Sequence, residues 1–257
     1  MEVKTMAEFA AQSEKPDILF WVGCAGSYDD RAKKISAAFA KILNHIGISF
    51  AILGSEESCS GDPAKRAGNE FLFQMQAMTN ISIMNEYGVK KIVTTCPHCF
   101  NILKNEYPML GGNYDVLHHS QFLSELLASG KLKVKGEVFA NQKITFHDPC
   151  YLGRGNDVYE APRDLIKSLS GDIVEMKRSK SKSLCCGAGG AQMFKEAEKG
   201  TKEINMERME DVKEVSPDIT AAGCPFCMTM LTDGVKMTDQ KTEVMDLAEL
   251  VAKACEL

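Results

Sequence analysis

Cysteine is the residue of this sequence whose number and spacing could do chemistry. Nine of the ten cysteines fall into two sets along the chain, and the tenth is Cys255 near the C-terminus. The first half holds Cys24, Cys59, Cys96 and Cys99, and the second half holds Cys150, Cys185, Cys186, Cys224 and Cys227. A disulfide between the adjacent Cys185 and Cys186 is unfavourable, and the glycines after them let backbone N–H groups approach a ligand. These sets predict metal–sulfur sites.

The composition predicts a globular protein of a reducing compartment. Hydrophobic residues make up 44% and charged residues 25% of the 257 residues, which is enough for a sizeable core. The net charge of −5 argues against a nucleic-acid partner. The sequence has neither an apolar run of membrane-spanning length nor a signal-peptide pattern. We therefore expect a cytoplasmic protein, in which cysteines serve metal binding or redox chemistry.

Each cysteine group follows a short apolar stretch that predicts a buried strand. In the first half these strands are expected at 18–22, 48–53, 91–94 and 114–117. In the second half they are expected at 144–146, at 173–176, at 219–221 and near Val244. Helical patterns separate the strands, including one expected over 191–211, and the lysine-rich segment 130–142 reads as a linker.

The two halves are copies of one another. Cys24 and Cys150 lie 126 positions apart, as do Cys59 and Cys185, and Cys96 lies 128 positions before Cys224. Such constant offsets indicate an internal duplication. The predicted fold is α/β with two pseudo-symmetric Rossmann-like lobes, 17–130 and 143–257, each built on a mostly parallel sheet. The carboxyl ends of parallel strands share one edge, so the cysteines of each half should converge there.

The number of cysteines in each half limits the metal chemistry. Five thiolates exceed the four that close a tetrahedral zinc site and suit an iron–sulfur cluster with an extra ligand. The first half has only four, because Ser60 stands where the second copy has Cys186. Four thiolates suit a cubane [4Fe–4S] cluster or zinc equally well. Asp62 could add an oxygen ligand, although an exposed turn aspartate is the plainer interpretation.

These residues resemble a known family. The pattern Cys-(x)n-Cys-Cys-Gly-(x)n-Cys-Pro-x-Cys, complete in the second half and with Ser60 in place of its second paired cysteine in the first, is that of the cysteine-rich CCG domain. The chain is similar to the B-type subunit of heterodisulfide reductase and to iron–sulfur subunits of lactate, glycerol-3-phosphate and flavoprotein–quinone oxidoreductases. The resemblance covers nearly all of residues 17–257.

The resemblance implies cofactors, partners and a function. It implies a non-cubane [4Fe–4S] cluster on Cys150, Cys185, Cys186, Cys224 and Cys227, and a second [4Fe–4S] cluster or zinc on Cys24, Cys59, Cys96 and Cys99. The chain lacks the ferredoxin-like Cys-x-x-Cys-x-x-Cys run of many relatives, which implies a ferredoxin-type or flavin partner subunit. The function implied is that of an oxidoreductase subunit passing electrons from such a partner to a disulfide or a quinone-type acceptor. Association with a membrane subunit at the inner face of the membrane is compatible with this role.

Two other functions stay open from the sequence. Cys96-Pro97-His98-Cys99 matches the active-site tetrapeptide of a strongly oxidising thiol–disulfide oxidoreductase. Zinc in both halves would instead give a structural or assembly subunit without a redox role.

Three histidines have candidate roles near the predicted sites. His147, three residues before Cys150, either donates a proton beside the cluster, as a catalytic residue, or orders its turn through a hydrogen bond to the backbone. His118 and His119 end a predicted strand on the cysteine edge, where either packing or a place in the site is compatible with the pattern.

Overall fold

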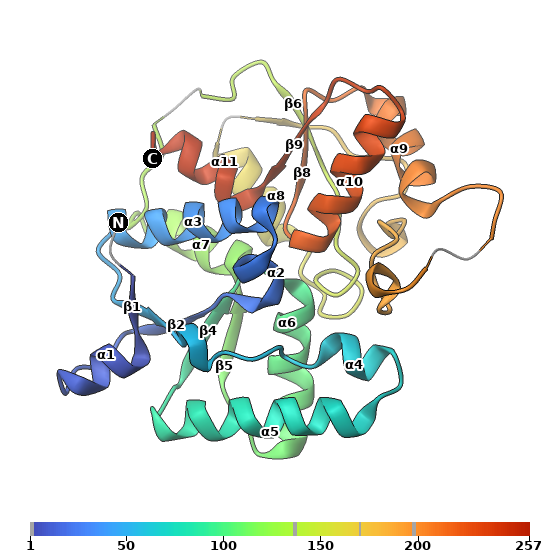
Figure 1. Ribbon diagram of the computed structural model, residues 1–257. Helices are drawn as coiled ribbons and strands as arrows, with labels where there is room; N and C mark the ends of the chain where they lie inside the picture. The colour runs from blue at the N-terminus through green and yellow to red at the C-terminus, as the bar shows by residue number, and fades with distance from the viewer. Residues whose placement is uncertain (1–2, 136–137, 170, 197–198) are drawn as a thin grey trace.

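The computed structural model describes residues 3–135, 138–169, 171–196 and 199–257 (Figure 1). Two parallel β-sheets lie one above the other in Figure 1, with helices between and around them. This confirms the predicted α/β architecture of two lobes. Among the described residues, no helix is both long enough and apolar enough to cross a bilayer.

The two sheets share one strand order. The first sheet runs β1-β3-β2-β4-β5 and the second runs β7-β6-β8-β9, and every pairing is parallel. The strands of the first sheet are β1 (Lys4–Thr5), β2 (Ile18–Trp21), β3 (Phe50–Ile52), β4 (Lys91–Thr94) and β5 (Asp115–His118). Those of the second are β6 (Lys143–Phe146), β7 (Asp172–Ile173), β8 (Ile219–Ala222) and β9 (Glu243–Asp246). Apart from β1, each strand has its counterpart at the same place in the other sheet, as the duplication requires.

The helices connect these strands as right-handed crossovers demand. The first lobe contains α1 (Met6–Ala11), α2 (Gly23–Tyr28), α3 (Asp30–His45), α4 (Asp62–Arg66), α5 (Glu70–Glu86), α6 (Pro97–Asn101) and α7 (His119–Ala128). The second contains α8 (Glu160–Ser168), α9 (Ile204–Val215), α10 (Pro225–Met237) and α11 (Leu247–Ala254). Short 3₁₀ turns lie at Gly54–Glu56, Tyr107–Leu110, Lys180–Lys182 and Gln192–Phe194, and a π-helical turn lies at Ile102–Glu106.

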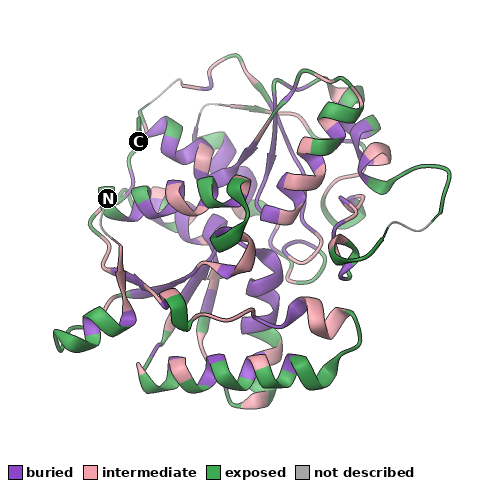
Figure 2. Ribbon diagram, in the orientation of Figure 1, coloured by how far each residue is buried: buried purple, intermediate pink, exposed green. Residues whose placement is uncertain are grey.

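A layer of helices joins the lobes. Helix α3 packs on α11, and α7 packs on α8, so each contact pairs one lobe with the other. Phe39 of α3 is fully buried there, in edge contact with Phe20 and Phe122. The same apolar cluster continues into the second lobe through Phe146 and Leu250, and Figure 2 shows buried residues running through the region where the lobes meet. A shared core of this kind holds the lobes in one relative position.

A partly buried ion pair ties the same interface. Arg31 of α3 donates to both carboxylate oxygens of Glu249 in α11, at 2.7 Å and 2.6 Å, and also to the carbonyl oxygen of Val244 at 3.1 Å. Bidentate pairing fixes orientation as well as distance.

Three segments differ from their predicted structure. The strand predicted at 173–176 is β7 at Asp172–Ile173, so residues 174–176 lie outside it. The helix predicted over 191–211 is wrong in its first half: a 3₁₀ turn stands at Gln192–Phe194, and α9 begins only at Ile204. Residues 197 and 198 of that prediction lie outside the described residues. The predicted linker 130–142, of which residues 136–137 are not described, places Leu132 and Phe139 in the core. The lobe boundaries 17–130 and 143–257 stay predictions.

We expect Phe39→Ala to destabilise both lobes together. Removing a fully buried phenylalanine side chain costs about 3–5 kcal/mol of unfolding free energy, and Phe39 belongs to the core that the lobes share. Calorimetry of the purified protein should show one transition at a lower temperature. Lys41→Ala on the exposed side of the same helix is the control and should change the unfolding free energy by less than about 0.5 kcal/mol. A separate transition for an unaffected second lobe would contradict a shared core.

Candidate metal centres

The five cysteines of the second copy converge at the carboxyl edge of their sheet. Cys150 follows β6, Cys224 is the N-cap of α10, and Cys227 lies in the first turn of that helix. The five thiols lie close enough to shift one another's pKa values. The Sγ atoms of Cys186 and Cys227 are hydrogen bonded, 3.3 Å apart. Cysteines up to 77 positions apart in the chain thus come together. We call these five cysteines the second-lobe set.

The surroundings of the second-lobe set favour thiolates at two positions. Hydrogen bonds from Cys150, Cys186 and the backbone lower the pKa of Cys185 far below its ordinary value. Burial raises the pKa of Cys224, but hydrogen bonds from Cys227 and His98 outweigh it and bring the pKa to about 5. The pKa values of the other three thiols are raised, mainly by their sulfur neighbours. Metals bind thiolates rather than thiols, so Cys185 and Cys224 are the two thiols already suited to a metal.

The four cysteines of the first copy also converge. The thiols of Cys24 and Cys59 shift each other's pKa values, as do those of Cys96 and Cys99. The hydrogen bond from Cys24 lowers the pKa of Cys59 to about 7. Ser60 places its Oγ 3.5 Å from the Sγ of Cys99, so a hydroxyl takes the position of the missing fifth thiol. We call these four cysteines the first-lobe set.

Burial argues against a thiol–disulfide exchange role for Cys96 and Cys99. Both thiols are at most 4% exposed. Burial raises the pKa of Cys96, and the hydrogen bond from Cys96 together with burial raises that of Cys99. An oxidising dithiol needs an accessible cysteine with a lowered pKa, and neither cysteine provides one.

Glycine is required at equivalent places in both sets. The backbone N–H of Gly61 donates to Cys59 Sγ at 3.5 Å, and that of Gly187 donates to Cys185 Sγ at 3.3 Å. Both glycines have positive φ angles, +91° and +98°, which side chains disfavour. A Cβ on Gly61 would also lie 2.7 Å from the ring of Phe73. The glycines therefore supply N–H···S bonds, as the sequence predicted for the second copy.

The two sets face each other where the lobes meet. His98 lies between the cysteines of the first Cys-Pro-x-Cys turn, and its ring meets that of Phe226, at the same place in the second turn, edge to face at 5.2 Å. Its Nδ1 lies 2.8 Å from Asp62 Oδ2. Burial alone would lower the pKa of His98, but its neighbours Asp62 and Cys224 outweigh it and raise the pKa to about 10. A small pocket opens here, lined by Asp62, Pro63, His98, Ala188, Ala191, Met193, Phe194 and Phe226.

Asp62 differs from its predicted position. It is not an exposed turn residue, because only 4% of its surface is accessible. One carboxylate oxygen accepts from Arg66 Nε at 3.1 Å, and the other bonds to His98. The carboxylate is thus directed at a histidine rather than at the sulfur atoms.

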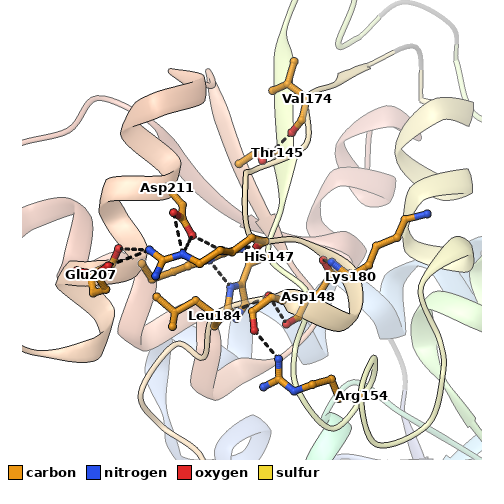
Figure 3. Close-up of polar contacts among 12 residues, drawn as sticks. Thr145, His147, Asp148, Arg154, Val174, Lys180, Leu184, Glu207 and Asp211 are labelled. Carbon is orange, nitrogen blue, oxygen red and sulfur yellow. Dashed lines mark hydrogen bonds and ion pairs between the residues drawn. The ribbon is translucent and has the colours of Figure 1, made fainter.

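His147 lies beside the second-lobe set. One of its ring nitrogens and the sulfur atoms of Cys186 and Cys227 all lie within 4.8 Å of one another. Its Nδ1 accepts a hydrogen bond of 3.1 Å from Arg208 Nε (Figure 3), so the ring proton resides on Nε2. Burial, with the Arg208 guanidinium, holds the pKa of His147 well below its usual value. The ring is therefore a neutral donor, held by an arginine rather than by the backbone.

A buried ionic network, of which Figure 3 shows the contact of Asp148 with Lys180, holds the loop that carries Cys185 and Cys186. Asp148 pairs with both Nη atoms of Arg163, at 2.7 Å and 3.0 Å, and accepts from the backbone N–H of Lys180 at 2.7 Å. Ser183 Oγ donates to the Asp148 carbonyl at 3.3 Å. The carboxylate of Asp148, just after β6, thus anchors the segment that leads to Cys185 and Cys186.

His118 and His119 serve the contact between the lobes. Both are fully buried. His118 Nε2 lies 3.0 Å from the carbonyl oxygen of Gly223, the residue before Cys224, and His119 Nε2 lies 3.0 Å from Asp246 Oδ1. They orient the second-lobe backbone from the first lobe, and this is a packing role.

Sequence analysis missed the polar support of the first-lobe set. Glu57 accepts hydrogen bonds from the backbone N–H groups of Val22 and Gly23, just before Cys24, and burial raises its pKa to about 7. Asn80 donates to the carbonyl oxygen of Cys59 at 3.1 Å, and Tyr107 donates to that of Ser60 at 3.1 Å. These residues lack any motif of their own, since only the fold brings them to the cysteine loops.

The residues present fit metal–sulfur groups. All ten cysteines are described, and none forms a disulfide. In the first lobe the Nε1 of the fully buried Trp21 has no hydrogen-bond partner among the described residues. A Cβ placed on Gly23 would lie 3.3 Å from Cys99 Sγ and 3.9 Å from this nitrogen. An unpaired buried donor is costly, and a sulfur-containing group beside Cys99 would satisfy it.

Comparison with known proteins gives consistent relatives. The model of the cysteine-rich domain (CCG) matches residues 18–104 and 144–232. The chain is 47% identical over 98% of its length to the probable iron-sulfur-binding oxidoreductase FadF of Bacillus subtilis, and 44% identical over 93% to the EtfAB:quinone oxidoreductase of Syntrophomonas wolfei. It covers only 36% and 34% of these proteins, so it spans about a third of their length.

A third relative belongs to a heterodisulfide reductase. The chain is 35% identical over 94% of its length to the D-type subunit of the dihydromethanophenazine:CoB--CoM heterodisulfide reductase of Methanosarcina barkeri, of which it covers 59%. This relative is the D-type rather than the B-type subunit of the sequence-based resemblance, within the same family. Among solved structures, a glutamate racemase from Francisella tularensis is 14% identical with a TM-score of 0.41, covering 93% of this chain and 78% of that one. A likeness this weak carries no functional implication.

Both copies of the motif are matched, and the relatives named as iron–sulfur proteins or oxidoreductase subunits align over nearly the whole chain. The chain belongs to the cysteine-rich CCG-domain family.

Proposed function

We propose that this chain carries electrons to an acceptor through a non-cubane [4Fe–4S] cluster held by Cys150, Cys185, Cys186, Cys224 and Cys227. The observation that carries the proposal is the convergence of these five cysteines at one sheet edge, where Cys186 Sγ and Cys227 Sγ are 3.3 Å apart. Five thiolates exceed the needs of zinc. The lowered pKa values of Cys185 and Cys224 support metal binding at this set.

In the first lobe we propose that Cys24, Cys59, Cys96 and Cys99 hold a second [4Fe–4S] cluster, with zinc as the competing occupant. The unpaired indole N–H of Trp21 supports the cluster, because bridging sulfide offers an acceptor beyond the four thiolates. The hydrogen bonds of Glu57, Asn80 and Tyr107 to the cysteine loops support a working site rather than a vestigial one.

The chain's own residues set the conditions for electron transfer. When bound, an iron–sulfur cluster supplies one-electron storage at a potential tuned by hydrogen bonds, charge and burial. Gly61 and Gly187 direct N–H groups at cysteine sulfur. His147, kept neutral and protonated on Nε2 by Arg208, is positioned to donate a hydrogen bond beside Cys186 and Cys227. Burial of Cys186, Cys224 and Cys227 excludes water.

The partners belong to the same proposal. Electrons come from a ferredoxin-type iron–sulfur subunit or a flavin subunit, and the acceptor is a disulfide or a quinone. The names of the relatives support both acceptors, since one is a quinone oxidoreductase and another belongs to a heterodisulfide reductase. A relative from Chromohalobacter salexigens, 41% identical, is named a probable membrane-anchored ferredoxin, which supports work at the inner face of the membrane through a partner.

We expect protein purified without oxygen to be brown, with about four to eight iron and sulfide ions per chain. One cluster would give the lower figure and two clusters the higher. Metal analysis and acid-labile sulfide assays measure this directly. Four iron ions with one zinc ion would assign zinc to the first lobe, and a colourless protein holding zinc alone would make the chain a structural or assembly subunit.

We expect Cys186→Ser to change the spectrum of the second-lobe cluster. This substitution gives the second copy the Cys-Ser-Gly loop of the first, with four thiolates instead of five. Electron paramagnetic resonance should show the loss of one signal while the first-lobe signal persists. Cys255→Ser is the matched control, because Cys255 belongs to neither set and its Sγ donates to the carbonyl oxygen of Lys133 at 3.7 Å. An unaltered spectrum in Cys186→Ser would refute the five-ligand assignment.

We expect His147→Leu to slow acceptor reduction without loss of iron. The neutral ring acts as a hydrogen-bond donor, and a hydrogen bond to a charged group is worth about 1.5–3 kcal/mol, so its loss should slow the reaction about 10- to 100-fold. The measurement is the reoxidation of dithionite-reduced protein by a disulfide and, separately, by a soluble quinone. His147→Gln is the matched variant, since its amide can donate where Nε2 does, and it should retain part of the rate. Equal rates for wild type and His147→Leu with both acceptors would remove the catalytic role.

A further inference from the structure

Trp21 and His147 occupy equivalent places in the two copies. Trp21 ends β2 and lies three residues before Cys24, and His147 follows β6 and lies three residues before Cys150. Each side chain is at most 1% exposed, and each carries a ring N–H group. The duplication has thus placed a buried ring with a donor nitrogen at the same point of each lobe.

The strand registers support this equivalence. The residue before Trp21 pairs with Val93 of β4, and the residue before His147 pairs with Ala221 of β8. Val93 and Ala221 are 128 positions apart, which is the offset that relates the two Cys-Pro-x-Cys turns. The two rings therefore follow equivalent strands and approach equivalent turns.

In the second lobe this ring lies next to a sulfur pair. One ring nitrogen of His147 and the Sγ atoms of Cys186 and Cys227 all lie within 4.8 Å of one another. The corresponding pair in the first lobe is Ser60 and Cys99, whose Oγ and Sγ atoms are 3.5 Å apart where the two sulfur atoms of the second lobe are 3.3 Å apart. The equivalence therefore places the indole of Trp21 beside Cys99.

The indole nitrogen of Trp21 is close to Cys99 and has no partner of its own. A Cβ built on Gly23 would lie 3.3 Å from Cys99 Sγ and 3.9 Å from Trp21 Nε1, so the sulfur and the nitrogen flank one point. Glu57 accepts from the Gly23 N–H at 2.5 Å and fixes this backbone. Nε1 has no hydrogen-bond partner among the residues that the structure describes, and an unpaired buried donor is costly.

We propose that the indole N–H of Trp21 donates a hydrogen bond to a bridging sulfide of the first-lobe cluster and raises its reduction potential. The inference rests on the proposed function, and within it on the cluster rather than zinc in the first lobe. A hydrogen bond to sulfur withdraws negative charge from a cluster and favours its reduced form. Indole is a donor only, so the bond needs no protonation step.

The experiment uses the fact that Trp21 is the single tryptophan of the chain. Benzothienylalanine, which has sulfur in place of the indole N–H, can therefore replace this one ring while keeping its shape. A redox titration is followed through the first-lobe signal, which is the one that persists in Cys186→Ser. The ratio of reduced to oxidised cluster at the wild-type midpoint should fall about tenfold, which for a one-electron couple is a fall of about 59 mV in midpoint potential.

Two variants and an internal control separate the hydrogen bond from packing. Trp21→Phe also removes the N–H group and should lower the first-lobe midpoint in the same direction. Trp21→His gives the first copy the residue of the second and keeps a donor, so its fall should be smaller. The midpoint of the second-lobe signal should be unchanged in all three proteins, because His147 is intact in each of them.

The wild-type protein gives a readout that no substitution can disturb. Labelling the indole nitrogen with ¹⁵N marks Trp21 alone, since the chain has no other tryptophan. Pulsed electron paramagnetic resonance of the reduced first-lobe cluster should detect coupling to this nitrogen and to its exchangeable proton. If none of the altered proteins keeps its first-lobe iron, this measurement decides, and a cluster without either coupling overturns the inference.

The outcomes also distinguish this inference from the proposed function. A wild-type midpoint in the benzothienylalanine protein, with full iron content, overturns the inference and leaves the proposed function standing. Four iron ions with one zinc ion in wild-type protein would overturn the inference while keeping the second-lobe cluster. Wild-type protein without iron overturns the proposed function and, with it, this inference. A fall confined to the first-lobe midpoint supports both.

Discussion

The apolar layer of α3, α7, α8 and α11 is the constraint on which the rest of the structure depends. A parallel sheet brings its cysteines to one edge, but it does not decide what that edge faces. Because α3 packs on α11 and α7 on α8, the two sheets are held with their cysteine edges directed at each other. The Arg31–Glu249 pair and the bonds of His118 and His119 then fix the register between lobes.

The sequence was sufficient to predict the features that the two copies share. Constant offsets between Cys24 and Cys150 and between Cys96 and Cys224 predicted the duplication, the parallel strands and the two sulfur sets. It was insufficient where tertiary contacts override local pattern. The segment before Ile204 has helical periodicity, but a 3₁₀ turn is the only helical structure among its described residues. Asp62 looked like a surface turn residue, because its partner His98 lies 36 positions away and no short-range pattern joins them.

The hydrogen bonds that hold the cysteine loops could not be predicted from the sequence, for a related reason. Glu57, Asn80 and Tyr107 form hydrogen bonds with the backbone of the cysteine loops. Other polar side chains of suitable length could form such bonds, so no sequence motif marks these positions. The same holds for Arg208, whose burial only the fold explains. It is stabilised by Asp211 at 2.9 Å and by the Arg178 carbonyl at 2.8 Å, and this arrangement in turn selects the tautomer of His147.

Duplication followed by divergence makes the two sides of the junction between the lobes chemically different. In a perfectly symmetric pair each copy would offer the other the same side chain, and neither sulfur set would differ from its neighbour. Ser60 reduces the first set to four thiols, and two residues later Asp62 holds His98, whose ring meets Phe226 of the second lobe edge to face at 5.2 Å. The two sides of the junction therefore differ in thiol number and in charge. Since hydrogen bonds and charge set the potential of a cluster, the clusters proposed for the two sets would have different potentials, which directed electron flow between them requires.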